Sequence, residues 1–471
     1  MERSFISKLY KSLLALTLST FIVSCGHHDD DDDHGHKHEE KSLVGFIYTT
    51  TNGEGLNKVI QLSRYSDGTL GDEKVYYTGD KGGANVDAGG DAHGDFDSQG
   101  AVQIIGDYLL TTSAGGNAIA VFQLDRKTGD LTFMQRVDSG GQRPVSIGYT
   151  KNTETEDQYW VVVGNQWNNP NIQKSGDDIE RYPNSAFFAQ DLTAADASDE
   201  LRSIVLFSFD SSNGALVRSD DIFLDNYNRQ NGGPTTVTFS DDGTRLAVAT
   251  WGIAHFSTNS PSLTEQRPSR VYVYNFNAED GTISGKRHFE KEGIAGTIGI
   301  NFAKDSNDVI HASNFNLVNE FLDHGLTILK DDGSEITLME NGNTGSENSH
   351  DEACWTVLSP DGSRLYLSSF GANVITPFDI NSEGGIAKKL AFEARSADTP
   401  GGDNKEMWVS PDNKHVYVLG AFQTFTLNRF KVTDDGLEYL DQYIYQETKN
   451  ARGEDSAGKY NFLGLTGFDI E

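Results

Sequence analysis

Apolar and polar residues alternate in short segments along most of the chain, from about residue 43 onward. Residues 121–124 (VFQL) and 271–276 (VYVYNF) are two such segments, and each is followed by a short turn that carries a glycine. Alternation with a period of two that ends in a glycine turn is typical of a β-hairpin. Because no stretch in this region shows competing helical periodicity, the pattern predicts an all-β protein.

The glycine turn recurs seven times, with an apolar residue one to three positions after the glycine. These glycines stand at positions 68, 129, 214, 281, 333, 384 and 436. A second kind of turn, such as Ser-Pro-Asp-Gly at 359–362, separates another pair of alternating strands within the repeats. Inner strands predicted near residues 102, 145, 236, 298, 355, 407 and 463 give the same count. Four strands in each of seven repeats predict a seven-bladed β-propeller.

The two ends of the repeat region complete one another. The first repeat begins at about Leu43 and supplies three strands without an inner strand. Residues 462–468 (FLGLTGF) form one more strand, which has no partners in its own repeat. We therefore expect this last strand to become the inner strand of the first blade, which closes the ring and removes open sheet edges.

The first 25 residues have the features of a bacterial export signal. Positive charges precede an apolar stretch at 13–23 that is too short to cross a bilayer. The stretch leads into Ser-Cys-Gly around Cys25, which resembles the lipobox whose cysteine is lipidated. Gly26 differs from the aspartate that retains lipoproteins in an inner membrane, so a lipid anchor in the outer membrane is expected, on its periplasmic side or at the cell surface. The predicted parts are a signal peptide at 1–25, a spacer at 26–42 and the propeller at 43–471.

The spacer has no apolar residue at 27–40, so it cannot fold by burial. Seven carboxylates accompany five histidines, which are His27, His28, His34, His36 and His38. Imidazoles and carboxylates at this density bind zinc weakly. Two interpretations stay open: a solvated stalk or surface-export signal, and metal capture near the membrane.

Charge and cysteine content exclude some classes of protein. The formal net charge is −32, which repels phosphate backbones, so a nucleic acid is not an expected partner. Cys354 is the one cysteine besides Cys25, so no internal disulfide is expected, and its apolar surroundings predict a buried structural thiol. The expected state is a monomer whose partners are the membrane, through the lipid anchor, and a small molecule or protein.

Several motifs resemble those of the lactonase-like seven-bladed propellers. They are the Ser-Pro-Asp-Gly turns, the Asp-Gly-x-Leu turns, and residues 353–355 (ACW) leading to 368–373 (SSFGAN). The resemblance covers about residues 43–471 and implies the propeller fold and an activity on lactones. Phosphogluconolactonase-type members carry Pro-His at the head of inner strands, whereas this chain has Pro144-Val145 and Pro234-Thr235 there. Phosphogluconolactonase activity is therefore not expected.

The long connections of the repeats all reach one face. In a blade whose first strand is innermost, the links between blades and the links between second and third strands emerge together. The long second-to-third links lie at 165–200, 251–270 and 314–324. Long loops on one face of a rigid scaffold usually carry binding sites. The candidate ligand-face residues are Trp167, Trp251, His255, Asn314, Asp351, Glu352 and Glu406.

Polar side chains before the inner strands supply candidate chemistry at the mouth of the channel. Opening a lactone needs a base that activates water and a cation or N–H donors for the oxyanion. The candidates are His93 and His350 for the base, and Arg143 and Lys405 for the cation. Carboxylates in the same region favour Ca²⁺ as an alternative ligand, and the candidate residues are Asp91, Asp95 and Asp97.

Three functions stay open on this basis. A binding or scaffold propeller comes first, because it requires only the rigid ring and the long loops. The second is a hydrolase or isomerase that acts on a lactone or a related cyclic acid. The third is extracytoplasmic capture or delivery of zinc, which would join the spacer histidines to His93 and its neighbouring carboxylates.

Overall fold

The computed structural model contains a compact unit at Lys41–Glu471. The described residues are 41–53, 55–83, 98–166, 172–173, 202–227, 232–252, 255–256, 268–294, 296–315, 324–346, 352–395, 401–449 and 460–470. The predictions for the signal peptide and for nearly all of the spacer lie outside them. Within these residues no helix is long and apolar enough to cross a membrane.

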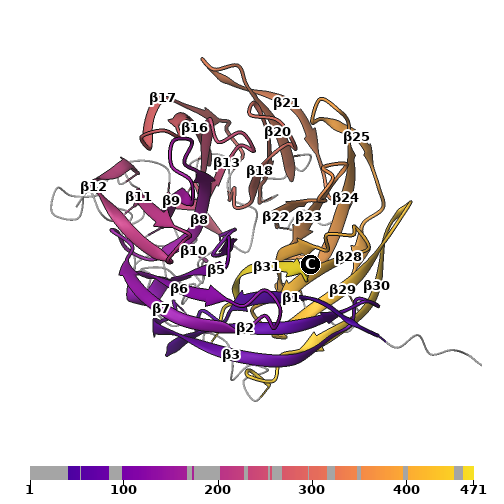
Figure 1. The fold of residues 1–471 in the computed structure, drawn as a ribbon. Coiled ribbons are helices and arrows are strands. Elements are labelled where there is room, and N and C mark those ends of the chain that lie inside the picture. Colours follow the sequence, from indigo (N-terminus) through magenta and orange to yellow (C-terminus); the bar gives the residue numbers. More distant parts are fainter. Residues whose placement is uncertain are drawn as a thin grey trace, which may run out of the picture. The chain divides into compact units, whose positions relative to one another are not determined.

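Seven antiparallel sheets form the unit, and Figure 1 shows them arranged in a ring. Blade 1 consists of β31 (Leu463–Asp469), β1 (Leu43–Thr50), β2 (Leu56–Tyr65) and β3 (Leu70–Lys81). Blade 2 consists of β4 (Val102–Ile105), β5 (Tyr108–Ser113), β6 (Ala118–Leu124) and β7 (Leu131–Asp138). Blade 3 consists of β8 (Pro144–Lys151), β9 (Gln158–Asn165), β11 (Ser203–Asp210) and β12 (Ala215–Asn226). Blade 4 consists of β13 (Pro234–Phe239), β14 (Arg245–Thr250), β16 (Arg270–Asn277) and β17 (Thr282–Glu290).

The remaining three blades follow the same order from the inner strand outward. Blade 5 consists of β18 (Ile300–Phe302), β19 (Val309–Ser313), β20 (Leu326–Asp331) and β21 (Ile336–Gly342). Blade 6 consists of β22 (Ala353–Leu358), β23 (Arg364–Ser369), β24 (Val374–Ile380) and the short outer strands β25 (Ile386–Lys389) and β26 (Glu393–Ala394). Blade 7 consists of β27 (Asn404–Val409), β28 (His415–Gly420), β29 (Thr426–Thr433) and β30 (Gly436–Ile444). Two further elements are a short turn of 3₁₀-helix, η1 (Ala114–Gly116), and a parallel pair of β10 (Ile172–Gln173) with β15 (His255–Phe256).

The predicted fold class is confirmed, including the way in which the ring closes. The last strand, β31, pairs antiparallel with β1, so that Gly45 lies opposite Asp469. An ion pair between Arg64 and Asp469 adds a second connection between the two ends of the repeat region. The outer edge of blade 6 departs from the regular pattern, because it breaks into β25 and β26 opposite Pro377, which has no N–H to donate.

Neighbouring blades are joined by side chains that donate to the glycine turns. Tyr48 of β1 donates through Oη to the carbonyl oxygen of Gly129 in blade 2 at 2.6 Å. In the same way His311 of β19 contacts the carbonyl oxygen of Gly384 in blade 6 through Nε2, at 2.7 Å. Each of these glycines has a positive φ, a backbone conformation that would strain a residue with a side chain. This conformation directs the carbonyl oxygen of the turn toward the neighbouring blade. The repeated glycine turn is thus also the acceptor for the preceding blade.

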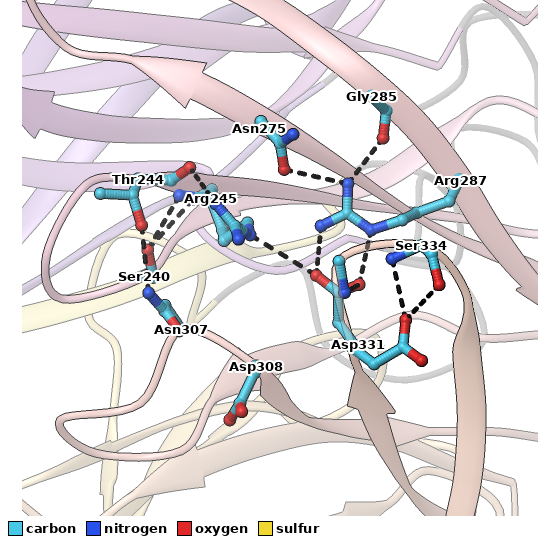
Figure 2. A network of polar contacts seen from close by, with 12 residues as sticks. Ser240, Thr244, Arg245, Asn275, Gly285, Arg287, Asn307, Asp308, Asp331 and Ser334 are labelled. Carbon is cyan, nitrogen blue, oxygen red and sulfur yellow. Dashed lines mark hydrogen bonds and ion pairs between the residues drawn. The ribbon is translucent and has the colours of Figure 1, made fainter.

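Blades 4 and 5 are joined by a buried ion pair instead. Arg287 of β17 donates through Nε and Nη2 to the two carboxylate oxygens of Asp331 (Figure 2). Its Nη1 donates to the carbonyl oxygen of Gly285 at 2.6 Å and to Oδ1 of Asn275 at 3.1 Å. Arg245 of β14 lies on the other side, with its Nε 3.6 Å from Oδ2 of Asp331. A carboxylate between two guanidinium groups keeps its charge compensated although it is buried.

Candidate functional site

A small cavity of about 170 Å³, lined by both polar and apolar side chains, lies at the centre of the ring. Its walls come from β4, β13, β18, β22, β27 and β31 and from the segment that leads into β4. The lining residues are Gln99, Gly100, Gln103, Thr236, Val237, Thr238, Ile300, Asn301, Thr356, Val357, Glu406, Met407, Trp408 and Leu465. Because the inner strands of different blades supply these groups, the cavity belongs to the central channel.

The segment Ser98–Gly100 crosses this channel. The carbonyl oxygen of Ser98 accepts a hydrogen bond from Nε1 of Trp355, in blade 6, at 2.8 Å. Gln99 accepts from the backbone N–H of Thr356 at 3.1 Å, and its Nε2 donates to the carbonyl oxygen of Ile300, in blade 5, at 3.3 Å. A connection between blades 1 and 2 therefore reaches the opposite side of the ring, and we call residues 98–100 the crossing segment.

Gly100 joins the crossing segment to two more blades. Its carbonyl oxygen accepts from the N–H of Ile147, in blade 3, at 2.9 Å, and its own N–H donates to Oε1 of Glu406, in blade 7, at 2.9 Å. Gly100 has a φ of +83°, and an added Cβ would lie 2.9 Å from Nε2 of Gln103. Glycine is favoured here because the backbone has a positive φ, a conformation that residues with a side chain rarely adopt.

Glu406 is the ionisable group of the cavity wall. Its side chain is 7% exposed, and its Oε2 is buried without a hydrogen-bond partner among the described residues. Burial raises the pKa of Glu406 from 4.5 to about 7, although backbone N–H groups, first that of Gly100, and the charge of Lys405 oppose this shift. The carboxyl group is therefore poised to gain or lose a proton near neutral pH.

Lys405 and Arg143 occupy different blades. Lys405 of β27 is buried, donates through Nζ to Oδ1 of Asn461, and lies 5.8 Å from the ring centroid of Trp355. Arg143 is half-buried in the connection that leads into β8, with a φ of +57°. Its backbone N–H donates to Oδ1 of Asn117 at 2.8 Å. The structure thus places Lys405 against Trp355 of blade 6 and Arg143 at the loop-bearing end of blade 3.

Two predicted ligand-face residues lie beneath the surface of that face. Trp251 is buried, and its ring packs edge-on against Phe315 with centroids 4.7 Å apart. Asn314 accepts from Oγ1 of Thr297 at 2.5 Å and donates to the carbonyl oxygen of His324 at 2.8 Å. Their contacts hold the connections of blades 4 and 5 in place, so these two residues support the face from below.

Glu352 and His255 lie in connections between strands of the loop-bearing face. Glu352 precedes β22 with a φ of +49°, and its carbonyl oxygen accepts from the N–H of Phe370 at 2.8 Å and from Sγ of Cys354 at 3.0 Å. His255 pairs through its backbone with Ile172 in the parallel pair of β10 and β15. This pairing brings the long connections of blades 3 and 4 together.

The other predicted site residues lie outside the described part of the chain. They are Cys25, His27, His28, His34, His36, His38, Asp91, His93, Asp95, Asp97, Trp167, His350 and Asp351. Among the described residues no group of three or more His, Cys, Asp or Glu side chains is arranged to hold a metal ion. The zinc and calcium hypotheses therefore stay predictions.

A buried network that sequence reasoning did not identify as such holds the loops of blade 7. Asp403 accepts from Nη1 of Arg395 at 2.8 Å and from the backbone N–H groups of Phe422 and Gln423 at 2.9 and 2.6 Å. Arg395 also donates to Oγ1 of Thr424 at 2.9 Å. The signal in the sequence was an Asp before an inner strand, but its arginine partner, eight residues earlier, could not be recognised without the fold.

A larger depression of about 1150 Å³ lies beside the turns of blades 4, 5 and 6, on the face that carries tight turns. Its acidic groups are engaged in local contacts. Asp242 accepts from Oγ of Ser240 at 2.6 Å and from Nδ2 of Asn307 at 2.8 Å, and these and similar bonds lower the pKa of Asp242 to about 2 against the effect of burial. Asp241 pairs with Lys304 at 3.2 Å. These carboxylates stabilise turns and the contact between blades 4 and 5.

Comparison with known proteins supports the fold. No protein-family model matches the chain. Muconate cycloisomerase 1 of Cutaneotrichosporon cutaneum is 30% identical over 87 residues, which are 18% of this chain and 22% of that protein. The chain thus spans about a fifth of the length of this curated relative.

Solved structures match over nearly their whole length. The periplasmic gluconolactonase PpgL of Pseudomonas aeruginosa superposes with a TM-score of 0.56 at 14% identity, covering 90% of this chain and 99% of PpgL. A protein from Lactobacillus plantarum gives a TM-score of 0.59 at 15% identity, with 90% and 99% coverage. The chain has the lactonase-like seven-bladed β-propeller fold. At this level of identity the likeness concerns the fold, and the chemistry has to be argued from the site.

Proposed function

We propose that this protein is an exported, lipid-anchored propeller that binds a small molecule in the cavity of its central channel. The observation that carries the proposal is the cavity around Glu406. Its walls are fixed by hydrogen bonds from the crossing segment to blades 3, 5, 6 and 7, and by a bond from the N–H of Gln99 to the carbonyl oxygen of Thr235, in blade 4, at 3.2 Å. Small-molecule sites are typically preformed, concave and provided with a few polar groups that converge on the ligand.

The arrangement of the described groups favours binding over catalysis. A hydrolytic site needs a base and oxyanion donors around one shared space. Glu406 faces the cavity, but the ammonium group of Lys405 contacts Asn461 and the ring of Trp355. Rigid walls with one poised carboxyl group are sufficient for selective binding, and they require no further catalytic group.

Ligand screening on the purified protein tests this proposal. Thermal unfolding would be followed in the presence of neutral sugars and lactones and of the corresponding acids. We expect at least one neutral compound to raise the Tm, since a ligand that binds only the folded state stabilises it. Gln103→Ala, which removes a polar group from the cavity wall, should weaken binding about tenfold, while Arg218→Ala, on the outer strand β12, should leave it unchanged. If no compound raised the Tm, or if both variants behaved alike, the proposal would fail.

Lipid anchoring is the second part of the proposal. It is supported by the lipobox-like sequence that ends at Cys25 and by the polar spacer that follows. Two or more acyl chains give stable membrane attachment. Labelling cells with a fatty-acid analogue should mark the wild-type protein, and Cys25→Ala should abolish the label. An unlabelled wild-type protein in the soluble fraction would contradict the anchor.

Lactone opening is the candidate enzymatic function, and the poised carboxyl group of Glu406 favours it. A carboxyl group with a pKa of about 7 is partly ionised at neutral pH, so it can take a proton from water that attacks a lactone carbonyl. PpgL, which shares the fold, is named a gluconolactonase. Acid release from glucono-1,5-lactone would be followed in a pH-stat. Hydrolysis above the buffer rate that falls at least a hundredfold in Glu406→Gln supports this function, and a rate equal to that of buffer eliminates it.

A further inference from the structure

One carboxylate oxygen of the channel cavity is left for a partner that enters from outside. Oε1 of Glu406 accepts the N–H of Gly100, whereas Oε2 is buried and accepts no hydrogen bond of regular geometry in the described part of the chain. The backbone N–H groups of Leu465 and Gly464 lie near the carboxyl group and favour its charged form, but burial outweighs them. A buried polar atom without a hydrogen bond keeps an uncompensated desolvation cost, which a ligand group that bonds to it would remove. Gln103, which lines the same cavity, also makes no side-chain hydrogen bond to a described residue. Two polar groups of the wall are therefore available to one ligand.

Among the described residues, Lys405 is the cation whose charge acts on Glu406, and it does not line the cavity. The strand β4 contributes Gln103, β22 contributes Thr356, and β31 contributes Leu465, all of which are uncharged. The strongest charge that acts on Glu406 is that of Lys405, and it is outweighed by burial, which raises the pKa of Glu406 to about 7. Glu406 thus lies in surroundings that favour its neutral form.

We propose that the cavity binds an uncharged molecule of about the size of one five- or six-membered ring, whose oxygen accepts a hydrogen bond from the protonated carboxyl group of Glu406. The inference rests on the proposed binding function and specifies the charge and size of the ligand. A cavity of about 150 Å³ accommodates benzene, and this one is of similar size. Oε2 carries the proton, and the amide of Gln103 provides a second contact.

The same geometry rejects anions. A carboxylate or phosphate ligand beside Glu406 would place two negative groups in a poorly solvated space, where they would have to share one proton. The net charge of −32 adds a repulsive field. A ring-opened hydroxy acid should therefore bind more weakly than its cyclic, uncharged form, and above pH 7 each bound neutral ligand should bring one proton with it.

The experiment compares two probes of similar size on the full chain purified in detergent. 2-Pyrrolidone is uncharged and is not hydrolysed under these conditions, and 4-hydroxybutyrate is an anion. Binding would be followed by ligand-observed NMR between pH 5.5 and 9. We expect 2-pyrrolidone to bind best below pH 7 and to lose about tenfold in affinity for each pH unit well above it. We expect 4-hydroxybutyrate to bind at least tenfold more weakly at every pH.

Two variants test whether the pH dependence of 2-pyrrolidone binding comes from Glu406. Glu406→Gln keeps a neutral hydrogen-bond donor, so it should bind 2-pyrrolidone without dependence on pH. Glu383→Gln, on the face with the tight turns, should behave like wild type. Affinity that is independent of pH in the wild type, preference for 4-hydroxybutyrate, or failure of 2-pyrrolidone to bind would each overturn the inference. If 2-pyrrolidone failed but a larger compound raised the Tm in the ligand screen, the proposed binding function would stand and only this inference about ligand size and charge would be wrong.

Discussion

The hydroxyl group of Tyr417 donates a hydrogen bond to the carbonyl oxygen of Gly68 at 2.8 Å, although 349 residues separate them. Tyr417 lies on β28 of blade 7 and Gly68 in the glycine turn of blade 1. The contact therefore joins blade 7 to blade 1 at the closure of the ring, in the same way that the hydrogen bond from Tyr48 to Gly129 joins blade 1 to blade 2. Closure depends on this contact as well as on the pairing of β31 with β1.

Removal of the Tyr417 hydroxyl should weaken the ring at its closure. Tyr417→Phe keeps the packing of the ring and leaves the carbonyl group of Gly68 without this donor, which should cost about 1–3 kcal/mol of unfolding free energy. Chemical denaturation followed by tryptophan fluorescence measures the loss. Tyr77→Phe, at a side chain that is 56% exposed, is the matched control and should change stability by less than about 0.5 kcal/mol. Equal effects of the two variants would contradict the role of this contact.

His311 should make the ring sensitive to acid. Burial lowers the pKa of His311 to about 4, against the opposing effect of its bond to Gly384. Between pH 6.5 and 4 the unfolded chain binds a proton that the folded chain does not, so stability falls as the pH falls through this window, by about 3 kcal/mol in full. His311→Gln should lose this dependence. Denaturation curves at pH 7 and pH 4.5 test it, and an unchanged difference between them would refute it.

Glu406 should change the free energy of unfolding with pH in the direction opposite to that of His311. Because burial raises the pKa of Glu406 to about 7, the folded chain binds more protons than the unfolded chain between pH 4.5 and 7. Stability attributable to this group is complete below pH 4.5 and declines as the pH rises through 7, by about 3 kcal/mol in full. Glu406→Gln should therefore stabilise the protein at pH 8 and be nearly neutral at pH 4.5. Glu383→Gln should show no such difference, and destabilisation by Glu406→Gln at pH 8 would contradict the prediction.

The fold was predictable from the sequence because its signals are local and repeated. Each glycine turn, such as that at Gly129, combines a positive φ with alternating strands on either side. The unpaired strand at 462–468 indicated closure because one strand was missing from the first repeat. The glycine turns and the inner strands were counted separately, and both counts gave seven, so the number of blades did not depend on any single turn.

The candidate site was less predictable because it is made by contacts between distant segments. Glu406 was expected on the ligand face, but nothing in the sequence indicates that Gly100, 306 positions earlier, donates to it. The role of the crossing segment depends on the width of the channel and on the direction of one connection. Trp251 and Asn314 were expected at the surface from their position in long links, but their neighbours enclose them.

The ion pair between Arg287 and Asp331 should be one of the main contributions to the contact of blades 4 and 5. Asp331→Asn removes the negative charge and leaves the buried guanidinium group uncompensated, which should cost about 3–5 kcal/mol. Asp305→Asn, in an exposed turn of the same region, is the control and should cost less than about 0.5 kcal/mol. A double-mutant cycle with Arg287→Met separates the pair from the loss of either partner, and we expect the double variant to be more stable than the sum of the single losses predicts. Strictly additive losses in that cycle would show that the two side chains contribute independently.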